Sequence, residues 1–189
     1  MGKKTKNIQV SEARSSTLRV ARAHFLYILV LATTVMLYDA WRLTAYEQSL
    51  SRWMSVVLMM FVGTATWYAA RYKTAQDKYY QAILFTIIAL DIFFAAYTVY
   101  LERGMSSSSV ILFAVPLVIS ALISRSSIFA TAAFCLTAYA LAILKYFYIE
   151  PAGEGIRVQL YGSLFLYGSC FFVLAALLYI VSSKNKYTD

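Results

Sequence analysis

The chain is poor in the residue types on which most soluble enzymes depend. Only 14% of its 189 residues are charged, and nine are Asp or Glu. Its one histidine, His24, cannot supply both axial ligands of a haem, and no group of His, Cys and acidic residues has metal-ligand spacing. The sequence also lacks the nucleophile-elbow, zinc-protease and phosphate-loop motifs. We therefore expect no enzymatic activity, no metal site and no cofactor.

Cysteine is equally scarce. The only two cysteines, Cys135 and Cys170, lie far apart in the sequence and within apolar stretches. A disulfide needs two cysteines at close range in an oxidising compartment. The pattern instead predicts two buried free thiols that act as small apolar residues.

Long hydrophobic runs take up most of the remaining sequence. The chain is 61% hydrophobic, with a mean hydropathy of +0.64. A bilayer core of about 30 Å needs about 20 apolar residues in a helix. We therefore predict an all-α, polytopic membrane protein, a bundle of six transmembrane helices. The six runs are Phe25–Trp41, Trp53–Ala70, Ala82–Leu101, Val110–Ile123, Ile128–Ile149 and Leu160–Val181.

The basic residues alternate with these runs. Twelve of the 17 Lys and Arg residues precede the first run, follow the second or fourth, or come after the sixth. Cytoplasmic loops of membrane proteins carry such an excess, so we expect both termini in the cytoplasm. The net charge of +8 then predicts contacts with anionic lipid headgroups and no binding of nucleic acid.

Composition divides the chain into three parts. Residues 1–22 form a basic cytoplasmic N-terminal arm, either weakly ordered or a short amphipathic helix on the membrane surface. Residues 23–182 form the six-helix transmembrane domain, and residues 183–189 form a short cytoplasmic tail. The segment Ser124–Ser127 predicts a tight turn that makes the fourth and fifth helices antiparallel neighbours.

The fourth run is too short to cross a bilayer, since 14 helical residues cover only about 20 Å. Two solutions are open. The helix begins earlier, among the serines 106–109, or the chain from Gly104 onward enters the bilayer as an irregular segment. Pro116 favours a kink in this helix, and the serines are suited to capping its N-terminus.

Asp91 is the sharpest functional signal, because it lies halfway along the third run. A carboxylate at that depth costs several kcal/mol unless it is paired, hydrogen-bonded or protonated. Helical spacing places Thr98 and Glu102 on the same face. One interpretation is a water-accessible cavity that opens outward; the other is a neutral Asp91 that is hydrogen-bonded to a Tyr or Ser of a neighbouring helix.

Further candidate residues lie near the outer ends of the helices. Tyr139 belongs to a face of the fifth run that could line the same cavity, and Lys145 lies one helix turn or more beyond it. Lys145 either extends to the headgroups or belongs to a charged vestibule. The other members of that vestibule would be Asp39, Arg42, Glu102 and Arg103. The structural alternative is a set of separate interface charges.

Part of the sequence resembles the six-helix membrane sensor region of bacterial histidine kinases. The similar segments are Leu90-Asp91, Tyr97–Ser107 and Phe113–Leu117. They match an Asp in one helix, a Gly-Gly-x-x-Ser/Asn-Pro loop and a short helix with a proline, although Arg103-Gly104 replaces Gly-Gly and the proline after the serines is absent. The resemblance implies a bacterial inner-membrane location and adds Gly104, Ser106, Ser107 and Pro116 to the candidate ligand-binding residues.

We therefore expect a non-enzymatic membrane sensor or ligand-binding subunit with a polar cavity around Asp91 that takes a small or lipophilic ligand. No kinase domain follows before Asp189, so we expect it to act through a partner protein or a homo-oligomer. Two alternatives remain open: a transport component, either a substrate-binding subunit or a proton-coupled carrier, and a structural accessory subunit of a larger membrane complex.

The predicted topology can be tested by cysteine labelling of intact cells. After both native cysteines are replaced by Ala, we expect an impermeant maleimide to label Gly153→Cys, in a predicted external loop, but not Ala75→Cys. Both sites should be labelled after cell lysis. Labelling of Ala75→Cys in intact cells would contradict the predicted orientation.

Overall fold

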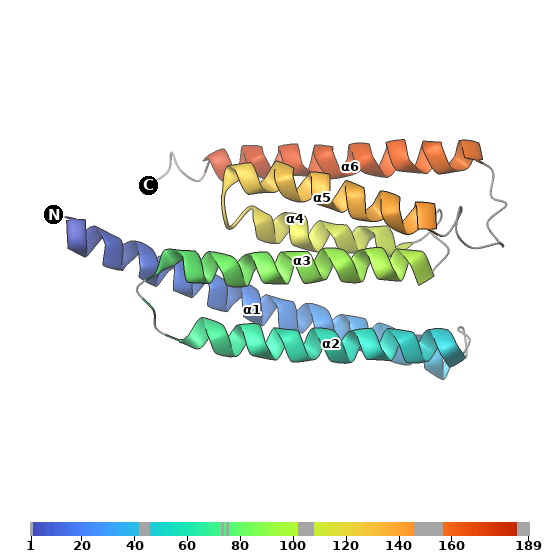
Figure 1. Cartoon of the computed structure of the whole chain (residues 1–189), viewed down its shortest axis with the longest axis horizontal. Helices are drawn as coiled ribbons and strands as arrows, with labels where there is room; N and C mark the ends of the chain where they lie inside the picture. The colour runs from blue at the N-terminus through green and yellow to red at the C-terminus, as the bar shows by residue number, and fades with distance from the viewer. Residues whose placement is uncertain are drawn as a thin grey trace. The chain divides into compact units, whose positions relative to one another are not determined.

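The computed structural model describes residues 2–41, 46–72, 74, 76–101, 108–145 and 157–184. These residues form six α-helices and one 3₁₀ helix, with no strand among them (Figure 1). The elements are α1 (Gly2–Ala40), α2 (Tyr46–Arg71), α3 (Asp77–Leu101), η1 (Ser108–Phe113), α4 (Ala114–Ser120), α5 (Arg125–Leu144) and α6 (Arg157–Lys184).

Helix length and composition confirm the membrane assignment. Five helical segments are long and apolar enough to cross a bilayer, and the segment Ser109–Ser120 is a shorter apolar helix. The second, third and sixth predicted runs lie within helices. The first and fourth runs extend past the ends of α1 at Ala40 and α4 at Ser120, and residues 146–149 of the fifth run lie outside the described residues. The protein is therefore an all-helical integral membrane protein.

The helices form two compact units, Met1–Ile87 and Ile88–Asp189. Because the boundary lies within α3, that helix contributes its first half to one unit and its second half to the other. All of the predicted site residues that the structure describes lie in the second unit.

In the first unit, α1 and α2 pack side by side as a helical pair (Figure 1). Gly63 of α2 permits their close approach, because a Cβ atom there would lie 3.0 Å from Ile28 Cδ1 and 3.4 Å from His24 Cδ2. At one end of the pair, Arg14 donates a hydrogen bond of 2.9 Å to the carbonyl oxygen of Arg71. This contact satisfies a carbonyl group at the C-terminus of α2.

Helix α1 joins residues 2–22 and the first hydrophobic run in one continuous helix. Its 39 residues extend about 58 Å, almost twice the thickness of a hydrocarbon core. Only Ala13–Ala40 has the apolar composition of a membrane span. The arm is thus the extension of a membrane helix, since no proline or interior glycine interrupts the segment.

Two tyrosines close the turn between α2 and α3. Tyr79 donates a hydrogen bond of 3.1 Å to the Ala69 carbonyl, and Tyr80 donates one of 2.9 Å to the Tyr72 carbonyl. Tyr80 also accepts a bond from the backbone N–H of Thr74. The first turn of α3 therefore satisfies carbonyl groups that the end of α2 leaves open.

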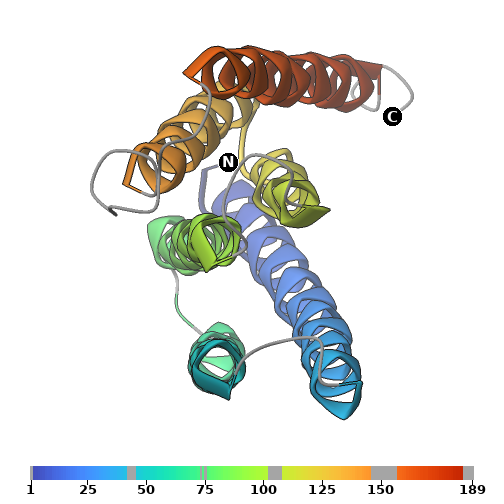
Figure 2. The same ribbon diagram turned by 90° about the vertical axis from the view of Figure 1, so that its right-hand side faces the viewer.

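In the second unit, α5 packs against α6, and the short α4 contacts both of them (Figure 2). The turn between α4 and α5 confirms the predicted tight connection. Ser124 caps α5 through a capping box with Ser127, and the Ser127 hydroxyl also donates a bond of 2.8 Å to the Ser120 carbonyl. Serine side chains thus join the end of α4 to the start of α5.

The fourth helix begins before the hydrophobic run, as the first of the two solutions requires. The segment starts as η1 at Ser108 and continues as α4 from Ala114 to Ser120. Phe113 occupies the N-cap position of α4 and makes no side-chain cap. The residues before Ser108, where a serine could cap the start of η1, lie outside the described part of the chain. Together η1 and α4 cover only about 22 Å, and the segment remains short for a membrane span.

A second glycine allows α5 and α6 to approach closely. A Cβ atom at Gly168 would lie 2.9 Å from Leu136 Cδ1, whereas one at Gly162 would have no neighbour within 4 Å. Small residues at helix contacts are expected in membranes, and Gly168 is such a residue in α6.

We predict that Gly168→Val destabilises the protein by about 1–3 kcal/mol, because the added atoms overpack the contact with Leu136. Gly162→Val is the matched control on the same helix and should be nearly neutral. SDS-induced unfolding in mixed micelles measures both variants. Equal losses would contradict the assigned contact.

Candidate functional site

Asp91 lies in α3 and has no exposed surface. Ala95, one turn further along the same face, is also fully buried. This face is therefore packed rather than open at these two positions. A buried carboxylate in the middle of a membrane span is costly and is usually kept for function.

Thr98 and Lys145 are arranged differently from Asp91. The Thr98 hydroxyl donates a hydrogen bond of 2.9 Å to the Phe94 carbonyl of its own helix, an ordinary way to satisfy a threonine in a helix. The Lys145 ammonium lies 4.6 Å from the centre of the Tyr100 ring, a favourable cation–π distance. Tyr100 is nine residues from Asp91, about 14 Å along α3, so Lys145 lies near the C-terminal end of α3 and well away from Asp91.

Several predicted residues cannot be placed. Glu102, Gly104, Ser106 and Ser107, together with Arg42 and Arg103 of the predicted vestibule, lie outside the described residues. Pro116 is described and is buried within α4. The structure thus places Asp91, Thr98, Pro116, Tyr139 and Lys145 in the same compact unit, Ile88–Asp189.

Tyr139 is the centre of an aromatic cluster, which consists of Phe113, Tyr139, Tyr167 and Phe171. Its ring centre lies 6.2 Å from that of Phe113, 5.4 Å from that of Tyr167 and 6.1 Å from that of Phe171, each in an edge-to-face arrangement. Its buried hydroxyl makes no hydrogen bond with any described residue. Tyr139 therefore packs as an aromatic ring where the sequence predicted a wall of an open cavity.

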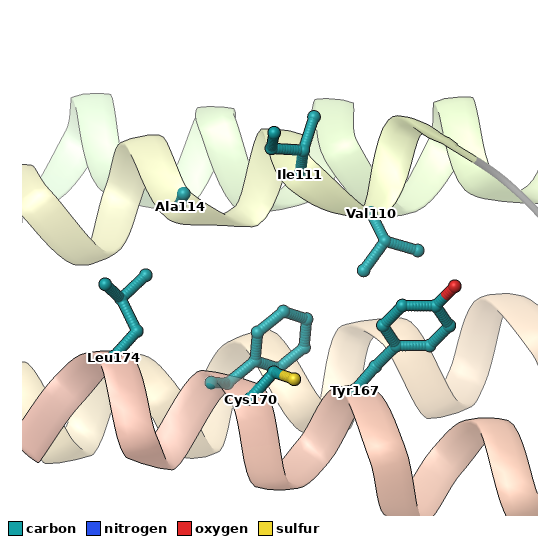
Figure 3. A pocket seen from close by; sticks show the side chains of 7 residues that line it. Val110, Ile111, Ala114, Tyr167, Cys170 and Leu174 are labelled. Atoms are coloured by element: carbon teal, nitrogen blue, oxygen red, sulfur yellow. The ribbon is translucent and has the colours of Figure 1, made fainter.

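A cavity of about 340 Å³ lies next to this cluster, between η1–α4 and α6 (Figure 3). Val110, Ile111 and Ala114 line one side of it, and Figure 3 shows the Val110 side chain directed toward α6. The residues from α6 are Tyr167, Cys170, Phe171 and Leu174. Tyr167 and Phe171 belong to the aromatic cluster, so Tyr139 contacts two of the residues that line the cavity without lining it itself.

None of the predicted ligand-binding residues lines this cavity. The four α6 residues have the i, i+3, i+4, i+7 spacing of one helix face, which on its own indicates an ordinary packed face. Only the fold brings that face to the segment 110–114. The two cysteines are both free, as predicted, but Cys170 at the cavity is exposed whereas Cys135 is buried.

A second carboxylate, Asp39, lies in the first unit, and the structure gives its hydrogen-bond partners. Asp39, near the end of α1, accepts hydrogen bonds from the hydroxyl of Ser49 and the indole N–H of Trp53, both on α2. Arg52 lies over the ring of Tyr38, with 5.3 Å between the guanidinium carbon and the ring centre. Asp39 therefore connects the ends of α1 and α2, and its charge has local donors.

The described helices define a polytopic α-helical membrane domain with a buried carboxylate, Asp91, in one of its spans. The family comparison is consistent with this class: residues 6–188 match the model of the PilS-like transmembrane domain. The chain belongs to that family, a six-transmembrane sensor domain of a histidine kinase, and this confirms the resemblance seen in residues 90–123. No curated protein and no solved structure matches the chain.

The aromatic cluster predicts that two substitutions of Tyr139 differ in their effect on the stability of the protein. Tyr139→Phe should leave stability unchanged within about 0.5 kcal/mol, because the hydroxyl has no hydrogen bond to lose. Tyr139→Ala should cost on the order of 3 kcal/mol, since it leaves a large cavity. SDS-induced unfolding again measures both, and a marked loss in Tyr139→Phe would show that the hydroxyl contributes to stability.

Proposed function

We propose that this chain is the non-enzymatic, membrane-embedded sensing part of a histidine kinase system. The observation that carries the proposal is the fully buried Asp91 in the middle of a membrane span of a PilS-like domain. Family membership supports a sensory role and gives no support to the transport alternative. The buried carboxylate supplies a group whose state a stimulus can change.

A carboxylate at this depth has two states of different cost. It is tolerated when neutral or when a partner compensates its charge, and it is expensive when it is charged and uncompensated. A small or lipophilic molecule that alters its protonation or its partners shifts the balance between helix arrangements. Because Asp91 is fully buried in this structure, a polar cavity around it would have to open from the outer side to admit that molecule.

The change at Asp91 would be transmitted to the cytoplasmic partner through contacts at the ends of the helices. Lys145 and Tyr100 associate near the ends of α5 and α3, and the serine turn joins α4 to α5. Movement of α3 at Asp91 would therefore be transmitted to α5 and then to α4. We propose that these shifts act on a cytoplasmic kinase, in a partner protein or a homo-oligomer.

The test is a fusion of this domain to the dimerisation and kinase part of a histidine kinase, reconstituted in liposomes. We predict that Asp91→Asn changes the autophosphorylation rate at least fivefold, the lower end of typical coupling between sites. Asp91→Asn keeps the size of the side chain and removes its ionisable group, so the protein should remain folded.

Asp39→Asn is the matched control. It makes the same chemical change in the first unit, where the carboxylate accepts bonds from Ser49 and Trp53. We expect this variant to retain the parental autophosphorylation rate. If Asp91→Asn also retained the parental rate while eluting as a folded protein, the role of Asp91 in sensing would be wrong.

A further inference from the structure

The cavity beside α6 lies in the middle of a membrane span. The apolar segment of α6 covers Tyr161–Ser182, and the cavity-lining residues extend from Tyr167 to Leu174. These positions begin about 9 Å and end about 20 Å along that segment. The cavity is therefore at the depth of the lipid hydrocarbon.

The chemistry of the cavity wall is almost wholly apolar. Its lining contains no charged residue, and its only side-chain heteroatoms are the Tyr167 hydroxyl and the Cys170 thiol. Val110 and Phe171 form a buried floor, whereas Ile111 is 75% exposed and Cys170 is also exposed. Such a wall favours a hydrocarbon occupant over a polar or charged one.

The floor is built by packed side chains. The Phe171 ring lies 5.3 Å from Phe113 and 6.1 Å from Tyr139, measured between ring centres. Tyr139 in turn contacts Tyr167 at 5.4 Å. These contacts fix the two aromatic residues that line the cavity, so its shape is preorganised for an occupant.

The size of the cavity favours a lipid chain over a protein helix as its occupant. A helix with its side chains is about 10 Å across, so a 10 Å length of it would occupy on the order of 800 Å³. The cavity holds about 340 Å³, less than half of that volume. Its lining row on α6 is about 10 Å long and follows a single helix face, which suits one extended chain.

The short fourth helix explains why a lipid chain would be needed at this position. Together η1 and α4 cover about 22 Å of a hydrocarbon core of about 30 Å. Three of the cavity-lining residues, Val110, Ile111 and Ala114, belong to this segment. An acyl chain in the groove would cover apolar surface that a full-length helix would otherwise cover.

We propose that the groove between η1–α4 and α6 is a specific site for one acyl chain of a membrane phospholipid. The chain lies along the row from Tyr167 to Leu174 and covers Phe171 and Ala114. This site involves neither Asp91 nor the proposed sensing role. Evidence against the sensing role of Asp91 would therefore leave the lipid site unaffected, and the reverse also holds.

The test uses the full chain in nanodiscs made with a phospholipid that carries a diazirine in one acyl chain. After irradiation, mass spectrometry locates the adducts. We expect at least fivefold more adduct per residue at Ile111 and Cys170 than at Phe61 and Phe165, exposed apolar residues outside the cavity. Uniform labelling of all exposed apolar residues would show ordinary surrounding lipid and would overturn the proposal.

Blocking variants make the test specific. Ala114→Phe should fill the groove and lower the adducts at Cys170 at least fivefold, whereas Val118→Phe, at an exposed position on the same helix, should leave them unchanged. Ile111→Trp narrows the exposed rim and serves as a second blocking variant if Ala114→Phe does not fold. Unchanged adducts in the folded blocking variants would overturn the proposal.

A second copy of the chain is the competing occupant, and oxidation of the cysteines tests for it. If the groove holds a lipid, Cys170 should not form a disulfide with Cys170 of another copy in the nanodisc. Efficient crosslinking through Cys170, lost in Cys170→Ala and retained in Cys135→Ala, would show that a second copy covers the groove.

Discussion

The structure depends on the requirement that every backbone amide in the hydrocarbon be hydrogen-bonded within the protein. A chain that is 61% hydrophobic meets this requirement by forming helices between its charged turns. The same requirement extends to side chains: the hydroxyls of Thr33, Thr64, Thr86, Thr98 and Thr137 each donate to the carbonyl four residues earlier. Polar groups that can be satisfied within their own helix carry little functional information. Thr98 is one of them, because its hydroxyl is satisfied by the Phe94 carbonyl without any ligand.

Carboxylates cannot be satisfied in this way, and Asp39 in α1 and Asp91 in α3 lie in contrasting environments. Asp39 lies near the end of α1 and accepts bonds from Ser49 and Trp53 of the neighbouring helix, so its charge stabilises a connection between two helices. Asp91 lies at mid-span and is fully buried. Its depth in the membrane span distinguishes Asp91 from Asp39, although both are aspartates, because the cost of a charge rises steeply toward the bilayer centre. The proposed sensing role follows from that difference.

Much of the fold could be predicted from local sequence. Each of the six hydrophobic runs coincides with an observed helix over most of its length, and the serine segment 124–127 forms the expected turn. The short fourth run also signalled an unusual helix, although the transition from η1 to α4 could not be foreseen, because 3₁₀ and α geometry differ too little in sequence preference. The candidate site was less predictable. Spacing identified Asp91 and Tyr139 as candidate site residues and predicted that Tyr139 lines an open cavity. In the structure, the Tyr139 ring packs within an aromatic cluster.

Hydrophobicity and charge along the chain by themselves determined that this protein is a helical membrane protein, because lipid imposes one backbone solution on any sufficiently long apolar run. They also determined the depth of each polar residue, since rise per residue converts sequence position into distance along the helix. Tertiary structure alone decided which faces meet: Gly168 against Leu136, and the α6 row opposite Val110 and Ala114. Apolar helices in lipid have no hydrophobic force that selects one partner face over another. That selection rests on van der Waals fit, which appears only when the helices are packed.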